Sequence, residues 1–154
     1  MAQISETQAD SADREIVTTR LIDEPRARVF KAWTDPDRLT RWWGPEGFTN
    51  TFHEFDPRPG GRWRFVMHGP DGVDYRNESV FQEVVESERI VFLHLRTMHR
   101  FLVIVTFADE GGKTRLVWRM RFESVTECEK VKRFAVEANE QNLNRLETEL
   151  ATMT

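Results

Sequence analysis

The chain has a single cysteine, no long apolar run and no excess of one charge. Cys128 stands alone among 154 residues, so no disulfide bond can form within the chain. No apolar stretch approaches the roughly 18 residues of a membrane-spanning helix, and residues 1–13 lack the apolar core of a signal peptide. The 22 basic and 26 acidic residues are mixed along the chain, without the basic patch of a nucleic-acid-binding or membrane-surface protein. We therefore expect a cytoplasmic protein with no nucleic-acid partner and no membrane partner.

Metal and nucleophilic chemistry find little support in the sequence. The four histidines, His53, His68, His94 and His99, fall on different predicted strands or turns and show none of the short spacings of metal ligands. There is no Gly-x-Ser-x-Gly motif, and Cys128 has no neighbouring histidine to activate it. We expect no metal and no cofactor, and we assign no catalytic residue.

The length of the chain is that of one ordinary domain. Residues 1–13 are dominated by Gln, Ser, Thr, Asp and Glu, a composition that cannot bury enough apolar surface to fold. We therefore expect a disordered N-terminal tail over residues 1–13 and a single domain over residues 14–154.

The longest continuous pattern lies at the end of the chain, in residues 125–153. Apolar residues recur there mostly at steps of three and four, which is the stripe of an amphipathic helix. The stripe consists of Val131, Phe134, Ala135, Ala138, Leu143, Leu146, Leu150 and Met153. A helix this long needs a large apolar surface to lie on, and a β-sheet is the only candidate upstream.

Short alternating segments separated by turn residues fill most of the chain before this helix. They predict seven strands, at residues 14–22, 48–56, 62–68, 74–85, 90–98, 101–108 and 113–122. Two short helices follow the first strand, one after Asp23 and one from Pro36 to Trp43. The predicted fold class is α+β, with the order β-α-α-β-β-β-β-β-β-α. Consecutive hairpins favour a curved seven-stranded antiparallel sheet wrapped around the C-terminal helix, with a cavity between the two.

Four motifs carry a resemblance to a known family. WWGPEGF, the D-x-R-x-G-G of residues 56–61, RWRFVM and GPDG, in this order, resemble the homologues of the activator of the heat-shock-protein-ninety ATPase. That family belongs to the START-like superfamily, also called SRPBCC, polyketide cyclase-like or helix-grip. The resemblance covers roughly residues 14–152 and implies the fold predicted above. It also implies a cavity that holds small hydrophobic ligands in some members, and it supplies no shared catalytic set.

One departure from the family stands in the final helix. Many relatives carry a Gly-Trp pair there, where this chain has Ala138 and Asn139. A tryptophan that would fill the cavity is therefore missing. Either the pocket is larger and more polar in this chain, or Trp118 or Phe134 fills the space.

Candidate ligand-binding residues come from several segments. Trp42 and Trp43 stand beside a Gly-Pro break, where they either close the mouth of a pocket or plug the core. Alternation on the strands places a second group on the concave face, where core packing is the alternative role. A third group is polar and is expected to reach the cavity or to contact water beside it. The complete candidate set is Trp42, Trp43, Phe65, Met67, Tyr75, Asn77, Trp118, Met120, Phe134, Asn139 and Asn142.

The pattern allows two positions for the polar residues of the fifth strand. His94 and Arg96 alternate with the apolar residues Val91, Leu93 and Leu95, which favours a position facing away from the core. The opposite register would point both side chains into the cavity, where they could bind an anion or transfer a proton.

The function expected from these features is binding of a small, largely hydrophobic molecule between the sheet and the C-terminal helix. One alternative is a cyclase-like or hydrolase-like enzyme that uses polar groups of the pocket. A further alternative is a co-chaperone-type protein that interacts through its surface. A homodimer and a chaperone partner stay open.

Overall fold

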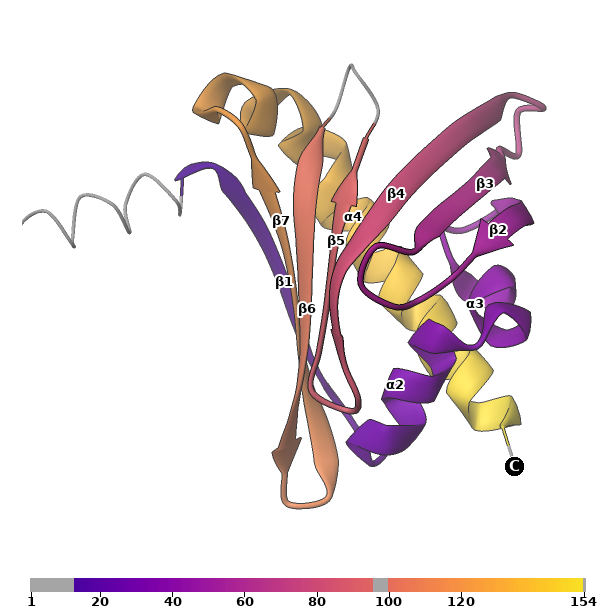
Figure 1. Ribbon diagram of the computed structural model, residues 1–154, viewed down its shortest axis with the longest axis vertical. Helices are drawn as coiled ribbons and strands as arrows, with labels where there is room; N and C mark the ends of the chain where they lie inside the picture. The colour runs from indigo at the N-terminus through magenta and orange to yellow at the C-terminus, as the bar shows by residue number, and fades with distance from the viewer. Residues whose placement is uncertain (1–12, 96–99, 154) are drawn as a thin grey trace, which may run out of the picture.

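The computed structural model describes residues 13–95 and 100–153, and its main element is one curved antiparallel sheet. The strands are β1 (Glu15–Ile22), β2 (Thr49–Phe55), β3 (Arg62–His68), β4 (Asp74–Val85), β5 (Arg89–His94), β6 (Phe101–Glu110) and β7 (Lys113–Phe122). The helices are α2 (Arg26–Thr34), α3 (Pro36–Trp42) and α4 (Val125–Thr152). Figure 1 shows α4 lying across one face of the sheet, with α2 and α3 beside its C-terminal half. All of the expected disordered tail except Asp13 lies outside the described residues.

The sheet is a meander of β2 to β7, and β1 is added at the β7 edge. Its seven strands lie in the order β1-β7-β6-β5-β4-β3-β2, and every neighbouring pair is antiparallel. From β2 to β7 each strand pairs with the next one along the chain, while β1 pairs with β7. The predicted fold, a hairpin-linked seven-stranded sheet with a long C-terminal helix, is therefore confirmed. Within the described ranges, no helix combines the length and the apolar character that a bilayer crossing requires.

Strand β7 shows how sequence alternation separates the two faces of the sheet. Every second side chain is buried on the concave face, as predicted. These residues are Leu116, Trp118, Met120 and Phe122. The arginines between them lie on the outer face, where Arg119 and Arg121 pair with Glu15 of β1 at 3.5 and 2.8 Å. The concave face is therefore apolar, and the charged groups stay at the solvent side.

Helix α4 begins at a capped turn and buries one face against the sheet. The Ser124 hydroxyl accepts a hydrogen bond of 3.1 Å from the backbone N–H of Glu127. The buried positions recur at helical spacing and are Cys128, Ala135, Asn139, Asn142, Leu143, Leu146, Glu149 and Leu150. Phe134 is not among them and is 73% exposed, which corrects its expected place in the cavity. Each residue turns a helix by about 100°, so only one of Phe134 and Ala135 can face the sheet, and Ala135 does.

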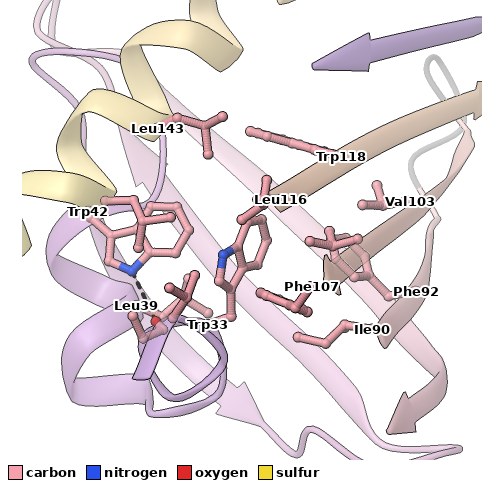
Figure 2. Packing of buried hydrophobic residues seen from close by; sticks show 14 of the residues in the cluster. Trp33, Leu39, Trp42, Ile90, Phe92, Val103, Phe107, Leu116, Trp118 and Leu143 are labelled. Atoms are coloured by element: carbon pink, nitrogen blue, oxygen red, sulfur yellow. Dashed lines mark hydrogen bonds between the residues drawn. The ribbon is translucent and has the colours of Figure 1, made fainter. Parts of the chain in front are cut away.

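Trp42 ends α3 inside the core rather than at a pocket mouth. Its indole N–H donates a hydrogen bond of 3.0 Å to the backbone carbonyl of Ala32 in α2 (Figure 2). In a continuing helix that carbonyl would accept from residue 36, which is Pro36 and has no N–H. The Trp42 ring also packs edge-to-face on Trp33, with 4.9 Å between centroids. Trp42 therefore packs in the core, which is the second of the two roles named for it above.

Candidate functional site

A cavity of about 170 Å³ lies between the concave face of the sheet and α4. Strands β3 to β7 supply most of its wall, α4 supplies residues 138, 139 and 142, and the loop after α3 supplies residues 43–45. The wall is mainly apolar and includes three of the five tryptophans. Eight of the sequence candidates line it: Trp43, Phe65, Met67, Asn77, Trp118, Met120, Asn139 and Asn142.

Tyr75, like Trp42 and Phe134, lies away from the cavity. Its cross-strand partner on β3 is Met67, so both side chains leave the same face of the sheet. Tyr75 stands near the turn between β3 and β4, where its ring lies 6.0 Å from that of Phe48 and 43% of the residue is exposed. Its face was predicted correctly, but its position along the strand puts the hydroxyl outside the cavity wall.

His94 is the site residue that the favoured sequence pattern placed on the wrong face. It lines the cavity, and its ring stacks on Phe101 with 4.6 Å between centroids. The pattern failed because both faces of β5 are apolar: Val91, on the outer face, is only 8% exposed, and Phe92 is buried on the inner one. The less favoured register is the one that His94 adopts, while Arg96 lies outside the described residues.

Hydrogen bonds around Asn77 determine which nitrogen of His94 carries a proton. The Asn77 Nδ2 group donates to the backbone carbonyl of Tyr75 at 3.0 Å, which turns its Oδ1 atom towards His94. The distance from this oxygen to His94 Nε2 is 2.9 Å. Since an amide oxygen can only accept, His94 Nε2 carries the hydrogen in this bond.

The α4 side of the cavity is polar because of two asparagines one helical turn apart. Asn142 accepts a hydrogen bond of 3.1 Å from the backbone N–H of Gly44 through Oδ1. Asn139 donates from Nδ2 to the hydroxyl of Thr18 at 3.3 Å and approaches the Met120 sulfur at 3.5 Å. Both asparagines are buried, with 6% of Asn139 and 4% of Asn142 exposed. Asn139, the position that departs from the family pattern, thus faces the cavity.

The loop after α3 closes one end of the cavity and is fastened to α4 by Arg145. Its guanidinium donates to the backbone carbonyls of Arg41, Trp43, Gly44 and Pro45 at 2.9 to 3.3 Å. Burial lowers the pKa of the Arg145 side chain, although the nearby Glu46 carboxylate acts in the opposite direction. An arginine keeps its charge at neutral pH despite such a shift, so it still donates all of these bonds.

Gly44 is required where this loop meets the sheet. Its φ angle is +100°, a conformation that favours glycine, and an added Cβ would lie 2.8 Å from the Met67 methyl carbon. The close approach brings Trp43 over the cavity, with its ring 5.1 Å from that of Trp63 and 5.6 Å from that of Trp118. Three indole rings therefore form one continuous wall.

The charges and nucleophiles near the cavity limit its chemistry. The described lining contains no aspartate, glutamate, lysine or arginine, and the described chain holds no group of three potential metal ligands. Ser79 lies directly across from His94 in the register of β4 and β5. The Ser79 hydroxyl is buried and makes no hydrogen bond within the described part of the chain, so His94 does not activate it. The site can enclose an apolar molecule and hydrogen-bond to it.

A curved antiparallel sheet gripping a long C-terminal helix, with a cavity between them, defines a START-like, helix-grip domain. The sequence pattern of the family described as "Activator of Hsp90 ATPase homolog 1-like protein" matches residues 23–151. The chain belongs to this family, as its motifs implied. No curated protein matches the chain.

Several solved bacterial proteins share the fold. A protein of Arthrobacter aurescens is 22% identical with a TM-score of 0.84, and the match covers 94% of this chain and 90% of that one. A protein of Mycobacterium smegmatis is 24% identical with a TM-score of 0.82, covering 94% and 95% of the two chains. A protein of Nitrosomonas europaea is 19% identical with a TM-score of 0.83, covering 91% and 96%. At these identities the likeness shows the fold alone.

Proposed function

We propose that this protein binds a small, largely hydrophobic molecule in the cavity between the sheet and α4. The observation that carries the proposal is a cavity of about 170 Å³ with a mainly apolar wall that includes three tryptophans. An apolar cavity of about 150 Å³ in another protein is known to bind benzene, so this space suits one ring with a small substituent. The proposed ligand is therefore about the size of a substituted benzene.

The wall combines rigid and adaptable groups. Trp43, Trp63 and Trp118 offer broad ring faces that bind apolar molecules at little cost in conformational entropy. Met67 and Met120 face the same space and can change rotamer to fit ligands of different outline. This combination supports binding of a small aromatic or alicyclic compound.

A second candidate function, an enzyme of the cyclase or hydrolase type, is favoured by one observation. His94 stands in the cavity wall, where an imidazole can act as a general acid or base. Such an enzyme would need His94 for turnover. Simple binding of an apolar ring would persist in a His94→Gln variant, which separates the two candidates.

Iodobenzene tests the binding proposal, because its heavy atom quenches indole emission on contact. We expect saturable quenching of tryptophan fluorescence that excess toluene reverses. The matched control is Phe134→Ala, which removes an exposed ring outside the cavity and should leave the binding curve unchanged. Quenching that rises linearly without saturation, or that toluene does not reverse, would contradict the proposal. Mass spectrometry of the denatured protein would then identify any molecule that co-purifies.

A further inference from the structure

We propose that the ligand carries an uncharged group that both donates and accepts a hydrogen bond, and that Asn139 and Asn142 bind this group. A primary carboxamide on a single ring is the chemical class that fits. The inference rests on the proposed function, since it names the polar end of the molecule that the cavity would hold.

Asn142 provides the donor. The backbone N–H of Gly44 needs an acceptor, which places Oδ1 of Asn142 towards the loop and Nδ2 on the opposite side. No acceptor for this Nδ2 group exists among the described residues. Asn142 lines the cavity, so a ligand carbonyl oxygen there could accept a hydrogen bond from this group.

Asn139 provides the acceptor. Its Nδ2 group is directed to the Thr18 hydroxyl and to the Met120 sulfur, and a thioether sulfur can only accept. Oδ1 is therefore the remaining polar atom, and no donor within residues 13–95 and 100–153 reaches it. A ligand N–H or O–H would complete its hydrogen bonding.

The two asparagines can act on one group of the ligand. They are three residues apart on α4, a spacing at which side chains lie on the same face of a helix about 5 to 6 Å apart at Cβ. A carboxamide presents its oxygen and its N–H side by side, so it matches a donor and an acceptor at this separation. The arrangement is that of two amides paired through complementary hydrogen bonds.

The residues that line the cavity also indicate the charge of the ligand. No lysine, arginine, aspartate or glutamate lines the cavity in the described part of the chain, so an ammonium group would enter without a counter-ion and a carboxylate would meet no permanently charged partner. Burying an unpaired charge is far more costly than burying a hydrogen-bonded amide. The structure therefore selects against benzoate and benzylammonium, although both have the size of benzamide.

Benzamide and acetophenone test the inference at pH 8, where an ordinary imidazole is neutral. The two compounds have nearly the same shape and both carry a carbonyl, but only benzamide carries the N–H donor. Acetophenone is the more apolar, so hydrophobicity alone would favour it. We expect calorimetry to show benzamide binding about tenfold more tightly than acetophenone, as one additional satisfied hydrogen bond allows. Benzoate should bind more weakly than either.

The Asn139→Leu variant removes the acceptor and keeps a side chain of similar size. We expect it to lose the preference for benzamide while it retains acetophenone. The control is Asn144→Leu, on the exposed side of α4, where Asn144 bonds to Arg20 and both affinities should stay at the wild-type values. If the Asn139 variant does not fold, the comparison of ligands on the wild-type protein still decides.

Two outcomes separate this inference from the proposed function. Equal or tighter binding of acetophenone by the wild-type protein would overturn the inference and leave the apolar binding site standing. Failure of benzamide, acetophenone and toluene alike to bind would overturn the proposed function itself.

Discussion

Asn142 on α4 accepts a hydrogen bond of 3.1 Å from the backbone N–H of Gly44, and this bond joins the long helix to the loop that carries Trp43. The next residues of the helix strengthen the connection. Gln141 accepts from the backbone N–H of Glu46 at 3.1 Å, and Arg145 donates to several loop carbonyls. The helix therefore both forms one side of the cavity and holds its closing loop in place.

Replacing Arg145 by methionine should loosen that loop. The variant keeps an unbranched side chain but removes donors to four backbone carbonyls, and hydrogen bonds to a charged group are worth about 1.5 to 3 kcal/mol. We expect a lower free energy of unfolding by about that amount, faster hydrogen exchange of residues 44–48 and faster dissociation of toluene. Stopped-flow dissociation and amide exchange measure these effects. Unchanged exchange in the loop would show that Arg145 does not hold it.

Replacing Asn139 by tryptophan should fill the cavity. The indole adds most of the volume that the cavity offers. We expect an equal or higher melting temperature together with loss of toluene binding, whereas Asn139→Leu should keep the apolar binding. Paired thermal denaturation and calorimetry check the expectation. A tryptophan variant that binds as tightly as the wild type would place residue 139 outside the binding space.

Neighbouring tryptophans should respond in opposite ways to substitution by phenylalanine. Trp42→Phe removes the indole N–H and leaves the Ala32 carbonyl without its donor, so the free energy of unfolding should fall by about 1 to 3 kcal/mol with little change in ligand affinity. Trp43→Phe removes part of the cavity wall, so it should weaken binding more than it lowers stability. Urea denaturation and calorimetry on the two variants give the comparison. A Trp42 variant that mainly loses affinity, with a Trp43 variant that mainly loses stability, would contradict these roles.

The thiol of Cys128 should be unreactive in the folded protein. Burial raises the pKa of this thiol, with Lys132 acting against the shift and Glu129 adding to it. The folded chain should therefore stay unlabelled by a disulfide reagent at pH 8, while urea-unfolded chain reacts fully. Because the folded pKa is the higher one, stability should be constant below the unfolded value of about 8.5 and should fall as the pH rises beyond it. Rapid labelling of native protein would contradict the buried position.

The sequence was sufficient for the fold because its local patterns agree with one another. Alternation on β7 and hairpin turns between consecutive strands lead to the same sheet. The turn between β6 and β7 is an example: Gly111 and Gly112 both adopt positive φ, the conformation that a tight hairpin turn requires. The final helix was expected over residues 125–153 and is found at Val125–Thr152.

The site was less predictable, because distance along an element and tertiary packing decide which side chains reach a cavity. Tyr75 has the predicted face but lies too close to the end of its strand. His94 was misplaced because β5 is apolar on both faces, so a period of two cannot identify the inner one. Phe134 belongs to the apolar stripe in the sequence but lies just beside the buried face of α4. In contrast, Asn139 was found through its departure from the family pattern.

The methionine methyl groups offer the most direct measurement of ligand binding in this cavity. The chain has five methionines, of which Met67 and Met120 line the cavity, whereas Met153 is buried at the end of the domain near Arg28. With carbon-13 in these methyl groups and assignments from single leucine substitutions, toluene can be titrated while NMR spectra are recorded. We predict saturable shifts for Met67 and Met120, caused by the nearby aromatic ring, and none for Met153. Unshifted Met67 and Met120 signals at saturating toluene would contradict a ligand-binding cavity between the sheet and α4.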